Sequence, residues 1–243
     1  MRLDVYLSDG GYTASRSRAQ ALIASGSVRV NGCVIRRPSF RVEGTETIEV
    51  EDRIRYVSRG GLKLEAALIA FGVDCTGRTV LDIGASSGGF TDCVLRHGAE
   101  LVYAVDVGTN QLSPQLREDP RVVCREHCNA RYLRVEDFPV RPTLAVMDVS
   151  FISQTLIHPA LAGILPPGAE YITLIKPQFE CGRGVLRNGI VRSEELRRSA
   201  RARVKASAEA CGFCFCGEIS SPIPGGDGNL EYLGHFIRKG ECT

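Results

Sequence analysis

The chain has 243 residues, of which 44% are hydrophobic and 24% charged, and its formal net charge is +2. This composition indicates a globular protein with one core of ordinary size and a small additional module, and no apolar run approaches the ~20 residues of a membrane-spanning helix. Because residues 1–5 also lack the apolar core of a signal peptide, we expect a cytoplasmic protein with no membrane partner, whose ten cysteines are reduced thiols.

The first 41 residues are strongly basic, with seven arginines against two aspartates. They predict a short helix, a longer helix and a hairpin, at residues 2–7, 15–25 and 28–35. The hairpin turns at Asn31-Gly32, a dipeptide typical of two-residue β-turns, and Gly26 ends the preceding helix. A basic module on a nearly neutral chain indicates an anionic partner at this end.

The order of these residues, R-L-D-x-x-L and then S-R-x-x-A-x-x-L-I-x-x-G-x-V-x-V-N-G, resembles the alpha-L RNA-binding module. That module occurs in a small-subunit ribosomal protein, in pseudouridine synthases and in tyrosyl-tRNA synthetases. The resemblance spans Arg2 to about Val50 and implies binding to structured RNA through phosphates and shape. We expect the module to cover residues 1–52, with a linker at 53–59. The arginines of this module expected to contact RNA are Arg2, Arg16, Arg18, Arg29 and Arg36.

The second domain, predicted to cover residues 60–243, is organised around the stretch from Thr79 to Phe90. An apolar run to Ile83 indicates a buried strand, and the glycine-rich segment after it indicates a tight turn into a helix. A second apolar strand, residues 101–105, ends in Asp106. Glycines let backbone N–H groups approach a ligand, and an acid after the second strand can bind a ribose diol. The pattern therefore predicts a nucleoside-binding cradle.

The turn itself reads Gly84-Ala-Ser-Ser-Gly-Gly89. It matches neither the G-x-G-x-x-G dinucleotide pattern nor the P-loop of nucleoside triphosphate enzymes. A ligand with an adenosine but no pyrophosphate fits such a turn better, and S-adenosylmethionine is the common example. The alternative at this point is a glycine turn with a purely structural role, so the decision depends on the rest of the chain.

Strands and helices continue to alternate after Asp106. Strands are expected at residues 121–124, 143–147, 169–175, 213–219 and 230–237, and helices at 150–162, with Pro159 as a kink, and at 194–210. This alternation predicts a doubly wound α/β sheet, which binds ligands at the carboxyl ends of its strands. Asp82, Asp106, Asp148 and Lys176 lie at or near such ends, where a charge marks either a site or a structural ion pair.

Five segments, in this order along the chain, resemble the TlyA family. The segments are Ser58–Lys63, Asp82–Thr91, Met147–Ile152, Ile175–Glu180 and Gly228–Leu233. The family consists of ribosomal RNA cytidine 2′-O-methyltransferases, often labelled haemolysins and related to FtsJ-type RNA methyltransferases. The resemblance implies a Rossmann-like class I methyltransferase sheet, mostly parallel with an antiparallel last strand, preceded by a small α+β RNA-binding module.

The resemblance also implies the residues of the site. A catalytic Lys-Asp-Lys-Glu tetrad falls on Lys63, Asp148, Lys176 and Glu231. The chain has only four lysines beside 26 arginines, and two of the four fall on the tetrad, where a cation able to release its proton is required. Binding of S-adenosylmethionine is expected at Asp82, Gly84, Ser86, Gly88, Phe90, Asp106 and Asn129.

The chemistry explains these residue types. A ribose 2′-hydroxyl is a poor nucleophile, so its proton must leave as the oxygen attacks the methyl group. Lys176 is the expected base and Asp148 orients it, while Lys63 and Glu231 position the hydroxyl and balance charge. Two further arginines are expected to contact RNA: Arg59, and Arg183 in a glycine-rich loop whose alternative is an ordinary surface loop.

Three cysteines close together, Cys211, Cys214 and Cys216, invite a metal hypothesis. No fourth ligand is evident nearby, so we expect core thiols and no bound metal.

The leading hypothesis is S-adenosylmethionine-dependent 2′-O-methylation of a cytidine in ribosomal RNA by a monomeric enzyme. Short members of the family tend to modify the large-subunit RNA only, so that subunit is the expected partner. One alternative is a non-catalytic RNA-binding factor of ribosome assembly, and another is a pore-forming haemolysin.

Overall fold

The structure, a computed structural model, describes the chain except residues 14–15, 51–55, 182–188, 227 and 241–243. It divides into two compact units, Met1–Arg55 and Tyr56–Thr243. Part of the expected linker belongs to the second unit, because Tyr56 is buried there and the Val57 N–H donates to Asp92 Oδ2 (2.8 Å). Within the described ranges, no helix is both long enough and apolar enough to cross a bilayer.

The first unit packs two helices against a three-stranded antiparallel sheet of order β2-β1-β3. Its elements are α1 (Leu3–Asp9), α2 (Arg16–Ser25), β1 (Val28–Val30), β2 (Cys33–Val34) and β3 (Ile48–Val50). The expected hairpin is confirmed, since Asn31 (φ 49°) and Gly32 (φ 78°) both take the left-handed backbone that its turn requires. Its core is built from Leu3, Leu7, Ala19, Leu22, Ile23, Val28, Val30 and Val42.

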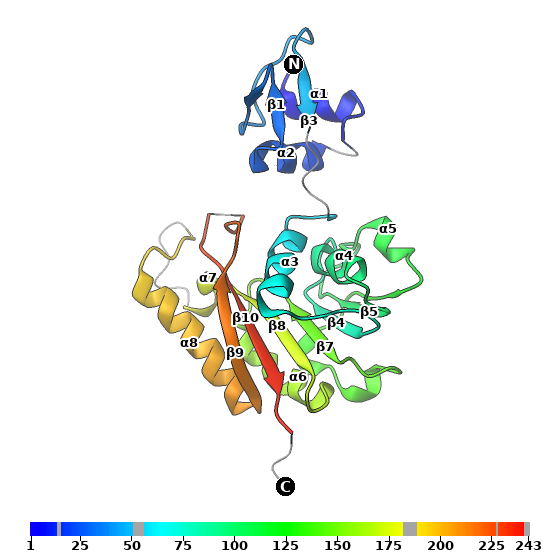
Figure 1. Ribbon diagram of the computed structural model, residues 1–243, viewed down its shortest axis with the longest axis vertical. Helices are drawn as coiled ribbons and strands as arrows, with labels where there is room; N and C mark the ends of the chain where they lie inside the picture. Colours follow the sequence, from blue (N-terminus) through cyan, green and yellow to red (C-terminus); the bar gives the residue numbers. More distant parts are fainter. Residues whose placement is uncertain (14–15, 51–55, 182–188, 227, 241–243) are drawn as a thin grey trace. The chain divides into compact units, whose positions relative to one another are not determined.

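The second unit is built on a seven-stranded sheet of order β6-β5-β4-β7-β8-β10-β9 (Figure 1). Its strands are β4 (Thr79–Ile83), β5 (Leu101–Val105), β6 (Val122–Arg125), β7 (Leu144–Met147), β8 (Glu170–Ile175), β9 (Phe213–Ser220) and β10 (Tyr232–Arg238). The strands from β6 to β8 are parallel, and β10 runs antiparallel to both of its neighbours. The predicted sheet, mostly parallel with an antiparallel last strand, is therefore confirmed.

Helices cover both faces of this sheet because side chains alternate along each strand. On one face, Val80 of β4 packs in a cluster with Leu64 and Val94 from helices; on the other, Leu81 clusters with Leu161. The α-helices are α3 (Gly60–Phe71), α4 (Gly89–Arg96), α5 (Pro114–Arg117), α6 (His158–Ile164), α7 (Pro177–Glu180) and α8 (Glu194–Ala210). Short 3-10 turns are η1 (Ala130–Tyr132), η2 (Val135–Asp137) and η3 (Gln154–Leu156).

The helix expected at residues 150–162 is wrong in its first half. The chain leaves β7 as a loop and forms η3, and α6 begins only at His158. Pro159 lies in the first turn of α6, where its missing N–H costs nothing, so it begins a helix rather than kinking one. The loop contains Phe151 with φ 64°, a backbone conformation that an α-helix cannot contain.

Candidate active site

Two adjoining cavities lie at the carboxyl ends of the parallel strands, where a sheet of this kind binds its ligands. The first has a volume of about 260 Å³ and the second about 340 Å³. Both are lined by Gly84, Ser86, Asp148 and Ser150, so the cavities share one border. The first also contains Arg59, Lys63, Phe90 and Lys176, and the second Asp106, Asn129 and Phe151.

The turn between β4 and α4 needs its glycines. Gly84 (φ 81°) and Gly88 (φ 95°) have left-handed backbones, which cost little only without a Cβ. A Cβ on Gly84 would lie 2.4 Å from the backbone oxygen of Asp148, and one on Gly88 would lie 2.2 Å from Leu116. The turn therefore brings bare backbone to the border of the two cavities. Gly84 lines that border, whereas Gly88 lies under the α5 segment.

The second cavity contains the acid expected after β5. Asp106 Oδ2 accepts from the Ser86 N–H (2.8 Å) and Oδ1 accepts from the Gly108 N–H (2.7 Å). Asn129 caps η1 by accepting from the Arg131 N–H (3.1 Å), and it lines the same cavity. These contacts leave lone pairs on the carboxylate of Asp106, which two ribose hydroxyls could use.

Asp82, which we expected to bind the cofactor, lies in neither cavity lining. It is fully buried on the central strand β4, where Thr91 Oγ1 donates to its Oδ2 (2.6 Å), and its Oδ1 has no hydrogen-bond partner among the described residues. Burial, opposed by the Thr91 hydrogen bond, raises the pKa of Asp82 to about 7. The structure thus places this acid beneath the cavity floor.

This burial predicts a pH effect on folding. A carboxyl that titrates near 7 when folded and near 3.8 when unfolded holds an extra proton in the folded state. Its contribution to the free energy of unfolding is therefore lost as the pH rises, by up to about 1.4 kcal/mol per pH unit. Asp82→Asn has no such loss. We therefore expect the free energy of unfolding of Asp82→Asn, measured relative to that of the wild type, to rise between pH 4 and pH 7 and to stay constant above pH 7. A relative stability that stays constant in urea titrations across this range would contradict the buried titration.

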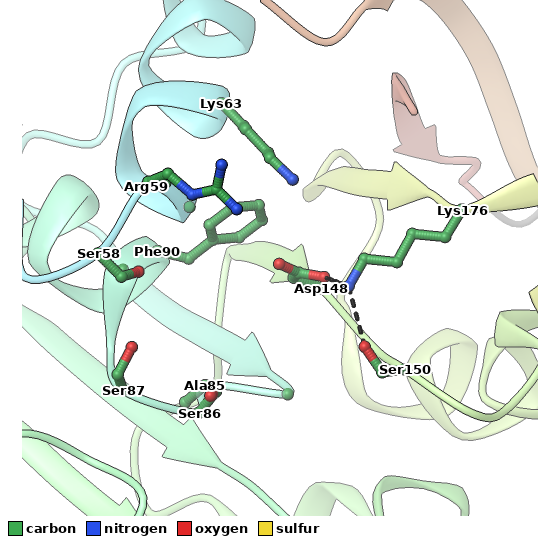
Figure 2. Close-up of a pocket in the computed structure, with 13 residues that line it drawn as sticks. Ser58, Arg59, Lys63, Ala85, Ser86, Ser87, Phe90, Asp148, Ser150 and Lys176 are labelled. Carbon is green, nitrogen blue, oxygen red and sulfur yellow. Dashed lines mark hydrogen bonds and ion pairs between the residues drawn. The ribbon is translucent and has the colours of Figure 1, made fainter. Parts of the chain in front are cut away.

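The expected tetrad is assembled as two ion pairs. Lys176 Nζ lies 2.5 Å from Asp148 Oδ1, and Lys63 Nζ lies 2.5 Å from Glu231 Oε2. Lys176 also donates to Ser150 Oγ (3.0 Å). Figure 2 shows the side chain of Lys63 extending from α3 toward the space above Asp148. The side chain of Lys176 approaches Asp148 from the opposite side. Three of the four charges, Lys63, Asp148 and Lys176, thus line the first cavity, and Glu231 pairs with Lys63 from outside its lining.

The two pairs differ in their exposure. The side chains of Lys63 and Glu231 are 9% and 3% exposed, whereas those of Lys176 and Asp148 are 13% and 23% exposed. Breaking a buried pair is costly because it leaves an unpaired buried charge, whereas a more open pair can exchange partners with a ligand. The Lys176 pair is therefore the better candidate for chemistry, and the Lys63 pair for support of the cavity wall.

The arginines of the first unit have structural partners that the sequence did not indicate. Arg2 and Arg16 both bind the buried carboxylate of Asp4, at 2.9 and 3.0 Å, and they hold the pKa of Asp4 well below its usual range. Their side chains remain about half exposed (46% and 53%). Arg29 donates to the Gly32 carbonyl.

The remaining predicted RNA contacts lie in different places. Arg36 donates to the Ala24 carbonyl of α2, and Arg59 lines the first cavity. The side chain of Arg18 and all of Arg183 lie outside the described residues.

Two residues of the site were missed from the sequence. Ser150 contacts Lys176, and Phe151 is 90% exposed with its ring 5.1 Å from that of Phe179. They follow Asp148 by two and three residues and lie in the Met147–Ile152 segment that carries the family resemblance, which was the available signal. Within the described part of the chain, no group of three or more His, Cys, Asp or Glu residues is arranged to hold a metal ion.

A doubly wound sheet with a glycine turn after one strand and an acid after the next defines a nucleoside-binding enzyme fold. Residues 56–238 match the FtsJ-like methyltransferase family and residues 1–48 match the S4 domain. The chain is 48% identical to hemolysin A of Brachyspira hyodysenteriae over 98% of this chain and 100% of that protein. The chain therefore belongs to the FtsJ-like methyltransferases, in the TlyA and hemolysin A group that carries an N-terminal S4 domain.

Other relatives have names that state an activity. The 16S/23S rRNA (cytidine-2′-O)-methyltransferase TlyA of Mycobacterium tuberculosis is 42% identical over 96% of this chain and 88% of its own length. The 23S rRNA (cytidine-2′-O)-methyltransferase TlyA of Campylobacter jejuni is 30% identical over 98% of this chain and its full length. A solved hemolysin structure from Streptococcus thermophilus, 44% identical, covers 98% of this chain and 88% of its own, with a TM-score of 0.79.

Proposed function

We propose that this protein transfers a methyl group from S-adenosylmethionine to the ribose 2′-oxygen of a cytidine in ribosomal RNA of the large subunit. The observation that carries the proposal is the pairing of Lys176 with Asp148 at the border between the first, cationic cavity and the second, nucleoside-type cavity. The two named TlyA relatives support the ribose chemistry and the cytidine. The Campylobacter jejuni protein, which this chain matches over its full length, supports the large subunit.

The residues present fit S-adenosylmethionine. The second cavity offers the Asp106 carboxylate for a ribose, Asn129 for a base, and apolar walls from Val105 and Ile157. The backbones of Gly84 and Asp148 can meet this closely at the cavity border only because Gly84 has no Cβ. When bound, S-adenosylmethionine supplies a methyl carbon activated by a neighbouring sulfonium. The residues proposed to hold it are Gly84, Ser86, Phe90, Asp106 and Asn129, with Gly88 and Asp82 supporting the turn from below.

The Lys176 pair supplies the proton chemistry in this proposal. In this proposal Lys176 reacts as the unprotonated amine, so that its Nζ can receive the proton of the 2′-hydroxyl as the new carbon–oxygen bond forms and the methyl carbon leaves sulfur. Asp148 aligns Nζ from one side and Ser150 from another. Lys63 and Glu231 position the ribose. Because Lys63 balances the charge of Glu231, this carboxylate does not repel the 2′-oxygen as that oxygen becomes negative.

Two features support an RNA substrate. The first unit matches the S4 domain and exposes arginines, which suits phosphate contacts. In the second unit, Phe151 is 90% exposed at the rim of the second cavity, so most of its apolar surface lies in water. An exposed ring of this kind is suited to stacking on a nucleobase.

Methyl transfer from labelled S-adenosylmethionine to purified, unmodified large and small ribosomal subunits tests the proposal. We expect label in the large subunit only. Equal labelling of isolated small subunits would overturn the choice of subunit. Labelling of neither subunit, together with no binding of S-adenosylmethionine in a calorimetric titration, would instead favour the non-catalytic RNA-binding factor.

Phe151 allows a prediction about RNA affinity. Loss of one base-stacking contact costs 1–3 kcal/mol, so Phe151→Ala is expected to raise KM for the RNA substrate by about tenfold. Phe151→Tyr keeps the ring and should stay within about twofold of the wild type. Steady-state kinetics with RNA as the varied substrate give both values. An unchanged KM in Phe151→Ala would show that the exposed ring does not contact RNA.

A further inference from the structure

Two chain segments hold the Lys176–Asp148 pair: the loop after β7, from Asp148 to Ser153, and the segment from Lys176 through α7. Glu180, the last residue of α7, links these segments. We propose that Glu180 is a positioning residue for methyl transfer, which fixes the loop after β7 against α7 and so sets Asp148 relative to Lys176. This inference rests on the proposed role of that pair.

The contacts of Glu180 are specific. Its side chain is buried, with the residue 3% exposed. One carboxyl oxygen accepts from Ser153 Oγ (2.6 Å) and the other from the Gln154 N–H (3.0 Å). Gln154 is the first residue of η3, so the carboxyl closes the far end of the loop that begins at Asp148.

The loop between Asp148 and Gln154 needs such a clamp. Phe151 has a left-handed backbone (φ 64°), which is strained for a bulky residue and persists only where neighbouring contacts enforce it. The segment that begins at Lys176 makes four contacts with this loop, besides the ion pair with Asp148. They are the two hydrogen bonds of Glu180, the ring contact between Phe179 and Phe151 (5.1 Å), and the hydrogen bond from Lys176 to Ser150 (3.0 Å; Figure 2).

Both ends of the clamp are themselves fixed to the core. Arg203 of α8 donates to the Glu180 carbonyl (3.0 Å). The Gln154 side chain accepts from Thr173 Oγ1 (2.6 Å) on the adjacent strand β8. The carboxyl therefore joins two rigid parts of the fold. Without its two acceptors, the buried Gln154 N–H loses its partner and the Ser153 hydroxyl keeps its contact with Thr155 Oγ1 (2.8 Å), so the loop has to move to satisfy the N–H.

Two variants of similar size separate positioning from simple packing. Glu180→Gln still accepts from Gln154 and can donate to Ser153, whereas Glu180→Met fills the same space without an acceptor. We expect Glu180→Met to lower kcat by about tenfold or more, because small displacements in a site are costly for the reaction. Glu180→Gln should restore kcat to within about threefold of the wild type, and the dissociation constant for S-adenosylmethionine should change less than kcat in both. The exposed Glu195→Gln on α8 is the matched control and should keep full activity.

Ser153→Ala provides a second route if Glu180→Met fails to fold. It removes one donor to Glu180 together with the Ser153 cap of η3, and we expect it to lower kcat while leaving the binding of S-adenosylmethionine intact. A folded Glu180→Met with wild-type kcat would overturn the inference, as would a Glu180→Gln variant no better than Glu180→Met. Lys176→Ala is measured beside them. If that variant remains active, the proposed catalytic pair is wrong; if it is inactive while every Glu180 variant is active, only the positioning role is wrong.

Discussion

Lys176→Ala is expected to lower methyl transfer by at least about a hundredfold, the usual contribution of a positioned acid–base group. The side chain removed is the one that lies 2.5 Å from Asp148 and 3.0 Å from Ser150 at the border of the two cavities. Because the residues proposed to hold the cofactor are unchanged, the dissociation constant for S-adenosylmethionine should stay within about threefold of the wild type. Single-turnover labelling and calorimetry measure the two quantities separately.

Lys205→Ala is the matched control for that experiment. Lys205 is one of the four lysines and lies on α8, with Nζ 4.4 Å from the centre of the Phe215 ring. Its loss should leave kcat unchanged. A Lys176→Ala variant that keeps wild-type kcat would remove this residue from the mechanism.

Gly84→Ala is expected to have the other large effect, on both cofactor binding and catalysis. The added Cβ would lie 2.4 Å from the backbone oxygen of Asp148, a separation that atoms do not tolerate, and at φ 81° an alanine is strained in any case. The atom in the way belongs to the backbone of Asp148 and not to a flexible side chain, so this backbone must move and the Asp148 carboxylate moves with it. We expect affinity for S-adenosylmethionine and kcat each to fall by about tenfold or more, since both depend on this border.

Gly163→Ala makes the same chemical change at a harmless position. Gly163 lies in α6 with open space around it, so alanine there should be neutral or slightly stabilising. If Gly84→Ala matches Gly163→Ala in cofactor affinity and kcat, the close approach of the glycine turn to Asp148 has no functional importance.

The sequence predicted those parts of the fold that local pattern controls. Apolar runs bounded by glycine gave the strands, and the hairpin at Asn31 followed from the two left-handed positions its turn needs. Charges at strand ends placed Asp106, Asp148 and Lys176 at one edge of the sheet, because parallel strands end together. The helix from residue 150 failed because contacts with distant residues, among them Glu180, hold that loop out of a helix.

Pairings between distant residues could not be predicted in this way. The sequence indicated Asp148 as the partner of Lys176, but nothing in it indicates that Lys63 would pair with Glu231. The contact of Arg16 with Asp4, twelve residues away, likewise cannot be predicted without knowing how α1 and α2 pack against each other. Asp82 differs from Asp106 because β4 is central and covered on both faces, whereas the strand end at Asp106 opens on a cavity.

The chemical form of the transferred methyl group tests the central claim most directly. After labelling of unmodified large subunits, the RNA is hydrolysed with alkali and the labelled product is identified by mass spectrometry. A methyl group on a ribose 2′-oxygen blocks cleavage at its own phosphodiester, so the account predicts label in alkali-resistant dinucleotides that yield 2′-O-methylcytidine. Label recovered in mononucleotides carrying a methylated base would contradict it, because the site would then act on a base and not on a ribose hydroxyl.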